Sequence, residues 1–418
     1  MTRQKAADAI DAVWRIESAR LIAGLARIVG DIGLAEDLAQ DALVAALEQW
    51  PESGVPDNPG AWLMATAKHR AIDQVRRRKM LVRKHEHLGR QLEERQISPE
   101  SAIADAIDDH VGDDLLRLIF TTCHPVLTTD ARVALTLRLL GGLTTDEIAR
   151  AFLQPRPTIQ QRIVRAKRTL AAARVPFEVP PPAELGARVE SVLEVIYLVF
   201  NEGYSATAGA DWVRPALCED ALRLGRILAE LAPEEAEVHG LVALMEIQAS
   251  RIRARVGPNG EPILLLQQDR GRWDYLLISR GLAALERAES LGGVYGPYAL
   301  QAAIAACHAR ARTAEETDWT RIVALYDALA QLMPSPVVEL NRGVALGMAF
   351  GPAAGLEVID QLRSDPTLAS YHLLPSVRGD LLAKLGRVEE ARAELKHAAA
   401  LTQNVREREL LLKKIEAL

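Results

Sequence analysis

Helical periodicity runs through almost the whole chain and constrains its fold more than any other feature. Ala, Leu, Glu and Arg dominate, and apolar residues recur three and four positions apart, the spacing that lines one face of an α-helix. Alternating runs typical of strands are scarce. The sequence therefore predicts an all-α fold.

Proline interrupts this pattern between residues 175 and 182, where VPFEVPPP cannot continue a helix because proline lacks the N–H donor. The mixed, acidic stretch 98–112 also looks like a connector. We expect domains at 1–90 and 113–174, linkers at 91–112 and 175–183, and a large C-terminal domain at 184–418.

Charge is segregated along the chain, although the net charge is only −6. Residues 31–57 carry seven acids and no Lys or Arg, whereas residues 150–174 carry seven bases and no acid. Residues 61–90 carry nine bases against two acids. Two separated basic stretches are suited to binding the phosphates of a DNA duplex at two places. On charge alone, solvated helix faces explain the pattern equally well.

The second domain carries the clearest local signal, two helices joined by a tight turn. Thr144 is an N-cap with Glu147 three residues later, as in a capping box, and Pro157 suits the first turn of a second helix. That helix has one apolar stripe, Ile159, Ile163, Ala166 and Leu170. Its other face holds Gln160, Gln161, Val164, Arg165 and Arg168. An ordinary helical hairpin shares the stripe, but glutamines and arginines without acids favour a DNA-reading helix-turn-helix.

Two stretches of the first domain are informative. Asp37, Gln40 and Asp41 fall within one helical turn and should form one exposed patch, which as a solvated helix face needs no partner. A second helix should open at Pro59 and Gly60. We expect its inward residues to be Trp62, Ala65, Ile72 and Val75.

These segments resemble a known family. DLAQDALVAALEQW followed by PGAWLMATAKHRAIDQVRRR is similar to region 2 of sigma-70 transcription initiation factors of the extracytoplasmic-function type. GLTTDEIARAFLQPRPTIQQRIVRAKRTL resembles region 4.2 of the same family and follows in the family's order. Residues 184–418 resemble the helical extension, similar to tetratricopeptide repeats, of one group of these factors.

The resemblance implies partners and residue roles. Core RNA polymerase would be contacted through its β′ subunit by Asp37, Gln40 and Asp41, and through its β subunit by the segment 114–140. The −10 promoter element would be bound by Trp62, Lys68, His69, Arg70, Arg76, Arg77 and Arg78, although His69 stands where the family usually has Asn. The −35 element would be bound by Arg156, Thr158, Gln160, Gln161, Arg162, Val164, Arg165 and Lys167.

The C-terminal domain has weak internal repetition. RGVAL at 342–346 recurs as RGDLL at 378–382, and Gly351 and Gly386 are 35 residues apart, close to the tetratricopeptide period. An irregular helical domain remains the alternative. The loop that includes residues 259–262 stands where the resembling group has a Gly-Pro signature. An ordinary surface loop without a regulatory role would have the same kind of sequence. Its candidate regulatory residues are Asn259, Gly260, Glu261, Pro262, Asp269, Arg270 and Trp273.

Nothing in the sequence indicates catalysis. The nine histidines and three cysteines lack zinc-ligand spacing, and no serine has a nucleophile-elbow setting. We expect no enzyme activity, cofactor or metal. The N-terminus lacks a signal-peptide core, and no apolar run approaches a membrane span, so we expect a cytoplasmic protein without a membrane partner.

The expected function is that of an alternative sigma factor whose C-terminal domain regulates it and has a possible protein partner. The alternative is a helix-turn-helix regulator that acts without polymerase, and whose repeat domain senses a ligand or a protein. A helical scaffold with no DNA role would leave the segregated charge unexplained.

Overall fold

The structure is a computed structural model, and it describes residues 3–86, 111–152, 154–206, 208–209, 211–258, 260–293 and 296–418. Within these residues helices dominate, and the named strands are one two-residue parallel pair, β1 (Ala208–Gly209) with β2 (Gln403–Asn404). The prediction of an all-α fold is confirmed. The chain divides into two compact units, residues 1–195 and 196–418, and each has buried apolar side chains of its own.

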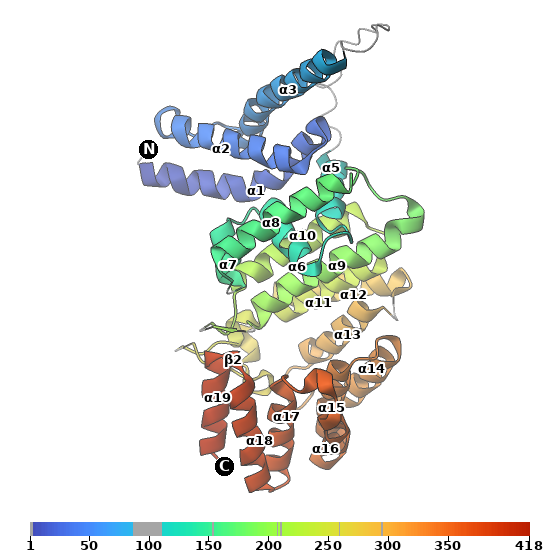
Figure 1. Ribbon diagram of the computed structural model, residues 1–418. Coiled ribbons are helices and arrows are strands. Elements are labelled where there is room, and N and C mark those ends of the chain that lie inside the picture. The colour runs from blue at the N-terminus through green and yellow to red at the C-terminus, as the bar shows by residue number, and fades with distance from the viewer. Residues whose placement is uncertain are drawn as a thin grey trace. The chain divides into compact units, whose positions relative to one another are not determined.

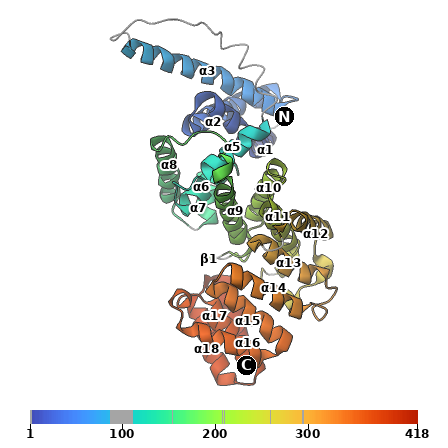
Figure 2. The ribbon, with the colours of Figure 1, turned by 90° about the vertical axis from the view of Figure 1, so that its right-hand side faces the viewer.

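The first unit begins with three long helices (Figure 1), and further helices follow them (Figure 2). The long helices are α1 (Arg3–Val29), α2 (Ile32–Ser53) and α3 (Pro59–Glu86). The helices that follow are α5 (Val111–Thr122), α6 (Thr129–Leu139), α7 (Thr145–Ala151), α8 (Arg156–Ala172) and α9 (Pro182–Tyr204). The division between the two units falls within α9.

Helices α1, α2 and α3 pack against one another. The side chain of Asp31 caps α2 by accepting hydrogen bonds from the backbone N–H groups of Gly33 and Leu34, at 2.8 and 3.0 Å. Near the end of α2, the buried Trp50 ring meets Trp62 of α3 edge-on, with centroids 5.3 Å apart. This contact fixes the start of α3 against α2.

The buried face of α3 differs from the predicted one. Among the side chains of α3 that the structure describes, Leu63, Ala67 and Ala71 are buried. Ala65, expected inside, is exposed, and Trp62 and Ile72 are only half-buried, while the side chain of Val75 lies outside those described. The prediction of an inward-facing residue was therefore wrong for Ala65 and held only in part for Trp62 and Ile72. Both sets of residues have helical spacing, and the packing of α3 on α1 and α2 decides between them.

The helix-turn-helix pattern is confirmed in detail. Thr144 Oγ1 accepts a hydrogen bond from Glu147 N at 3.2 Å, and Glu147 Oε2 accepts one from Thr144 N at 2.8 Å, which is the predicted capping box. Helix α8 starts at Arg156 with Pro157 in its first turn. The predicted stripe is the buried face of α8: Ile159, Ile163, Ala166 and Leu170.

The first half of α9 belongs with α5 and α6. Ser191 Oγ donates to the carbonyl oxygen of Cys123 at 2.7 Å, and Arg188 donates to the carbonyl oxygen of Phe120 at 2.5 Å. Val192 in the same half is 1% exposed. A chain that is cut in the proline-rich segment before α9 would therefore lose part of the first unit's core.

The second unit holds the remaining helices. The α-helices are α10 (Pro215–Leu231), α11 (Ala236–Ala249), α12 (Tyr275–Ser290), α13 (Pro297–Arg310), α14 (Trp319–Leu332), α15 (Pro336–Phe350), α16 (Pro352–Gln361), α17 (Leu373–Lys384), α18 (Val388–Leu401) and α19 (Val405–Glu416). The 3₁₀ turns are η1 (Ile252–Ala254), η2 (Leu265–Gln267), η3 (Arg270–Arg272), η5 (Leu362–Ser364) and η6 (Pro366–Leu368).

Two helical hairpins, α15–α16 and α17–α18, carry the repeated sequence (Figure 2). In the first, Arg342 Nε lies 2.6 Å from the Asp327 carboxylate of the preceding helix; in the second, Arg378 Nε lies 2.7 Å from Asp360, also on the preceding helix. The repeated arginines thus make equivalent ion pairs between helices.

Glycines at equivalent places join the helices of these two hairpins. Gly351 and Gly386 stand between the helices with φ of 98° and 75°, a conformation that favours glycine. Their 35-residue spacing in the sequence therefore corresponds to one structural position.

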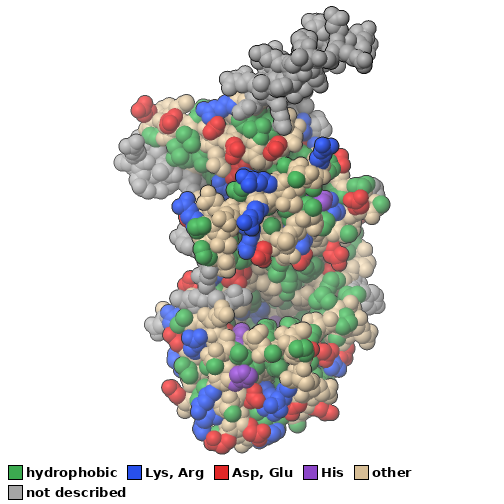
Figure 3. Space-filling view, viewed as in Figure 1, with side chains coloured by type: hydrophobic (Ala, Val, Ile, Leu, Met, Phe, Trp, Pro, Cys, Tyr) green, Lys and Arg blue, Asp and Glu red, His purple; other side chains and the backbone are tan. Residues whose placement is uncertain are grey.

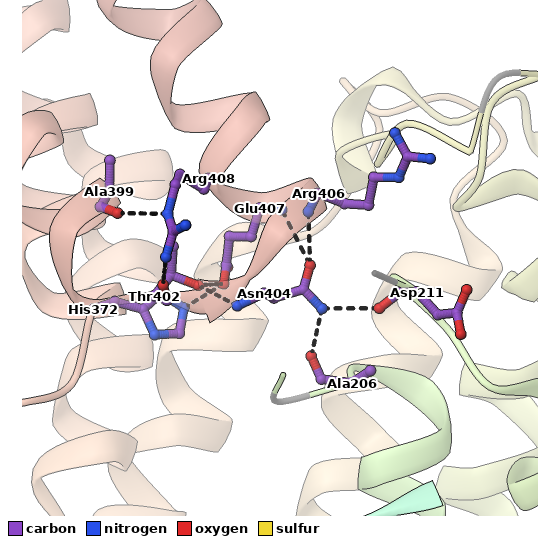
Figure 4. A network of polar contacts seen from close by, with 9 residues as sticks. All are labelled: Ala206, Asp211, His372, Ala399, Thr402, Asn404, Arg406, Glu407 and Arg408. Carbon is purple, nitrogen blue, oxygen red and sulfur yellow. Dashed lines mark hydrogen bonds and ion pairs between the residues drawn. The ribbon is translucent and has the colours of Figure 1, made fainter. Parts of the chain in front are cut away.

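Asn404 ties the last helix to a distant loop of the same unit (Figure 4). Its amide nitrogen donates to the carbonyl oxygens of Ala206 and Asp211 at 2.9 and 2.8 Å, and its amide oxygen caps α19 by accepting from Arg406 N and Glu407 N. Asn404 is 1% exposed. A buried side chain with each polar atom paired fixes both segments.

Candidate nucleic-acid interface

The side chains of α8 that face away from the buried stripe form a polar surface on the first unit. Gln160, Gln161, Val164 and Arg165 are exposed. Figure 3 shows blue Lys and Arg side chains over the surface of this helix. Amide and guanidinium groups pair with base edges, and guanidinium groups also pair with phosphate. The surface therefore has the chemistry to contact a DNA groove.

The other predicted −35 residues are either half-buried or paired with carboxylates. Thr158 is half-buried in the first turn. Three bases pair with carboxylates: Arg156 with Asp146 at 3.2 Å, Arg162 with Asp130 at 3.0 Å, and Lys167 with Glu36. The Arg156–Asp146 pair is exposed and weak, whereas the Lys167 pair involves a buried carboxylate.

The predicted −10 residues lie along α3. Trp62 is half-buried against Trp50, and Lys68 is half-buried. His69 is exposed, with Nδ1 2.8 Å from the Ala65 carbonyl oxygen of its own helix. Arg70 is partly exposed and lies 3.3 Å from Asp41 of α2. Arg76, Arg77 and Arg78 belong to the same helix, and their side chains lie outside those described.

The predicted polymerase-docking residues form one patch on α2. Asp37 and Asp41 are exposed and Gln40 is half-buried, so the expected exposure holds for the two carboxylates. Partial burial raises the pKa of Asp37; Lys167 opposes this shift, and the neighbouring Glu36 and Asp41 carboxylates add to it. The patch is therefore acidic and lies within the electrostatic influence of α8.

Glu36 is a central residue that the sequence analysis did not single out. It is 3% exposed, and its carboxylate pairs with Arg138 of α6 at 2.6 Å and with Lys167 of α8. It also accepts a hydrogen bond from Gln40 at 2.6 Å. A second pair, Arg27 with Asp114 at 2.9 Å, joins α1 to α5. Helix α2 and the helix-turn-helix are thus connected by buried charge.

The predicted regulatory residues lie in a hydrogen-bonded loop of the second unit. Gly260 has φ of 80° and donates to Gly257, and Pro262 bridges to Val256. Glu261 is half-buried. Asn259 lies outside the described residues. The predicted turn is confirmed.

The other three members of that regulatory set lie close together in the sequence after the loop. Asp269 caps η3 by accepting from Gly271 N at 2.9 Å. Arg270 lies over the ring of the buried Trp273, 4.7 Å from its centroid. The set therefore divides into a turn and an arginine–tryptophan contact.

The described residues hold no group of three or more His, Cys, Asp and Glu side chains arranged to take a metal ion. The three cysteines are free and buried. None of the helices described has the length and apolar character needed to cross a membrane.

Comparison with known families assigns three segments of the chain. The model described as Sigma-70 region 2 matches residues 16–80, and that described as Sigma-70, region 4 matches residues 117–170. A third, described as Family of unknown function (DUF6596), matches residues 188–289. The first model covers most of α1–α3 and the second covers the helix-turn-helix.

Similar proteins agree with these matches over different lengths. An uncharacterized protein of Rhizobium meliloti is 44% identical over 385 residues, 92% of this chain and 89% of the relative. The ECF RNA polymerase sigma factor SigC of Mycobacterium tuberculosis is 32% identical over 148 residues, 35% of this chain and 74% of the relative. SigK of Mycobacterium ulcerans is 31% identical over 153 residues, 35% of this chain and 75% of the relative. No solved structure matches the chain.

Fold and surface together define a helical protein with a helix-turn-helix preceded by an acidic and basic three-helix domain. The chain belongs to the family of ECF RNA polymerase sigma factors. That family consists of non-catalytic transcription initiation factors, and residues 188–289 add a domain of unknown function to it.

Proposed function

We propose that the protein binds core RNA polymerase and directs it to promoters by contacting a −35 and a −10 element. The exposed polar face of α8 carries this proposal, because it presents Gln160, Gln161 and Arg165 next to one another at a helix-turn-helix. The −10 contacts would come from α3, and polymerase docking from Asp37, Gln40 and Asp41 on α2 and from the segment 114–140.

Co-purification with core polymerase followed by run-off transcription tests the proposal. We expect the full chain to bind core enzyme and to yield transcripts from promoters selected from its own genome. The triple substitution Asp37→Ala, Gln40→Ala, Asp41→Ala should weaken core binding and leave the helical content unchanged, since two of the three side chains are exposed. Equal binding by the triple variant would rule out the docking role of this patch.

The alternative is a helix-turn-helix regulator that acts without polymerase. It predicts sequence-specific DNA binding by the purified chain and no association with core enzyme. The segregated charge favours the sigma-factor proposal, because an acidic patch on α2 has no role in binding DNA phosphates directly. Transcription that depends on adding the chain to core enzyme separates the two functions.

For the C-terminal unit we propose a regulatory domain built from repeats similar to tetratricopeptide repeats and suited to a protein partner. The equivalent arginine pairs and glycines of α15–α16 and α17–α18 support the repeat. Stacked hairpins present surfaces that bind protein segments.

Truncation tests the regulatory role, and the cut belongs after Val195 rather than before α9. The first half of α9 packs on α5 and α6, so this cut retains the first unit. We expect the yield of transcript to differ from that of the full chain. A higher yield means inhibition by the removed unit, a lower one assistance, and an equal yield in vitro and in cells contradicts regulation.

A further inference from the structure

Two arginines of the second unit lie in a buried cluster without a counter-charge. Arg251 follows α11 and is 8% exposed, and Arg255 is half-buried four residues later. No carboxylate pairs with either of them within the part of the chain that the structure describes. The Nε atoms of both arginines are buried and have no hydrogen-bond partner there.

Two buried acidic residues of the flanking helices are already paired with other arginines. Glu202 of α9 accepts from Arg214, and Glu246 of α11 lies 2.8 Å from Arg226. Burial lowers the pKa of Arg251, Tyr204 opposes that shift, and the neighbouring charge of Arg255 adds to it. No carboxylate among the residues that the structure describes therefore compensates the positive charge at this place.

Aromatic rings surround the two guanidinium groups. The Arg255 guanidinium carbon lies 3.8 Å from the centroid of the Tyr204 ring and 5.4 Å from that of Trp212. The Arg251 guanidinium carbon lies 5.8 Å from the ring centroids of both Tyr204 and Trp273. The indole N–H groups of Trp212 and Trp273 are also buried without acceptors among the described residues. The cluster thus offers unused donors and no unused negative charge.

We propose that Arg251 and Arg255 form a binding site for a small oxyanion, the phosphate or carboxylate group of a small molecule. The planar guanidinium presents paired N–H donors that match two oxygens of either group. A bound oxyanion would supply the missing counter-charge, since a buried cation without one is costly. The cluster from Tyr204 to Trp273 lies entirely within residues 188–289, the segment matched to a family of unknown function.

A structural role accounts more fully for a third arginine than for these two. Arg270 lies over the Trp273 ring, but it also donates to the carbonyl oxygens of His308 and Ala311. Its donors are therefore used within the protein. Cation–π contacts offset part of the cost of burying Arg251 and Arg255. Arg255 also donates through one terminal nitrogen to the Tyr204 carbonyl oxygen at 3.1 Å, but the Nε–H donors of both arginines have no partner among the described residues.

Titration of the full-length chain with inorganic phosphate and, separately, with citrate tests the proposal. Because Trp212 and Trp273 lie within 6 Å of the arginines, their fluorescence should change saturably, and calorimetry should give the same affinity. Binding of phosphate alone identifies a phosphate site and binding of citrate alone a carboxylate site. A wild-type chain that binds neither overturns the proposal.

Matched variants separate the site from general charge. Arg251→Met should weaken binding at least tenfold, and Arg255→Lys should weaken it severalfold, because lysine keeps the charge and loses the paired donors. Arg253→Met, an exposed arginine between them, should bind as the wild type does. If Arg251→Met does not fold, as judged by circular dichroism, Arg255→Lys decides. Equal losses in Arg253→Met and Arg255→Lys would contradict a specific site.

Discussion

Gln160 and Gln161 point away from the buried stripe of α8 and are exposed near its N-terminal end. Each amide can pair with an adenine edge, and a good bidentate pair discriminates by about 1–3 kcal/mol. We expect Gln160→Ala and Gln161→Ala to relax the base preference in the −35 element, measured by competition binding to a library of promoter duplexes.

Arg165→Ala is the matched variant on the same face. If Arg165 contacts phosphate, its loss should weaken binding to all sequences alike and reduce the salt dependence of affinity. A base preference that stays unchanged in both glutamine variants would argue against α8 as the reading helix.

Glu407 carries a prediction about pH. Its carboxylate lies 2.8 Å from His372 and accepts from Thr402 Oγ1 at 2.7 Å (Figure 4). Burial alone raises the pKa of Glu407, but the hydrogen bonds from His372 and Thr402 outweigh it, so the pKa is lowered below its ordinary value of 4.5. Such a group stabilises the fold at pH above 4.5, and this contribution is lost as the pH falls through the lowered value.

Glu407→Gln should therefore destabilise the second unit at neutral pH by about 1 kcal/mol, and the gap from wild type should close in acid. Urea unfolding at several pH values measures it. Glu409→Gln, which removes an exposed pair with Arg406, should have little effect at any pH. A gap for Glu407→Gln that is independent of pH would contradict the assignment.

At the scale of helices, close approach of α15 and α16 depends on glycine. A Cβ atom added at Gly355 would lie 2.7 Å from the Gly343 carbonyl oxygen and 2.8 Å from Gly347 Cα. Since these are backbone atoms, the two helices would have to move apart. We expect Gly355→Ala to destabilise this hairpin by about 1–3 kcal/mol, the usual cost of overpacking, and to speed hydrogen exchange in α15 and α16.

Gly186→Ala is the control for helix propensity. Gly186 lies inside α9 with no atom near its missing Cβ, so alanine should stabilise that helix by up to about 1 kcal/mol. If Gly355→Ala instead slowed hydrogen exchange in α15 and α16, the two helices would be loosely packed where they meet at Gly355.

Local features of the helices were predictable from the sequence, whereas the choice of buried face was not always so. The capping box at Thr144 and the stripe of α8 depend on residues a few positions apart, and both are confirmed. The buried face of α3 was misassigned because Ala65 and Ala67 are equally apolar, and packing on α1 and α2 buries only the second. Spacing identifies a helix, and its partners select the face.

Contacts between distant residues escaped the sequence analysis altogether. Glu36 and Arg138 are 102 positions apart, and Glu36 looked like one acid among seven. Arg251 and Arg255 looked like ordinary bases after α11, because nothing local shows that Tyr204 and Trp212 lie against them. These contacts depend on tertiary structure, which spacing along one helix does not report.

At the scale of the first unit, the proposed polymerase-docking patch on α2 and the proposed −35 helix α8 are linked through one buried carboxylate. Glu36 holds Lys167 of α8, while Gln40 of the patch donates to the same carboxylate. The Lys167 ammonium has three N–H donors, so a DNA phosphate would either share it with Glu36 or draw it away. We therefore expect binding of a −35 element through Lys167 to weaken the contact that joins α2 to α8.

Glu36→Gln removes one side of that contact. We expect the variant to bind a −35 duplex severalfold more tightly at low salt, because Lys167 becomes available to a phosphate. One additional phosphate contact should steepen the slope of log affinity against log salt by about 0.9, measured by fluorescence anisotropy. Glu194→Gln serves as control, since Glu194 pairs with Arg132 of the same unit and does not contact Lys167. We expect Glu194→Gln to keep the affinity and the salt slope of the wild type. If Glu36→Gln also keeps both wild-type values, Glu36 does not restrain Lys167. The two halves of the unit would then bind their partners independently.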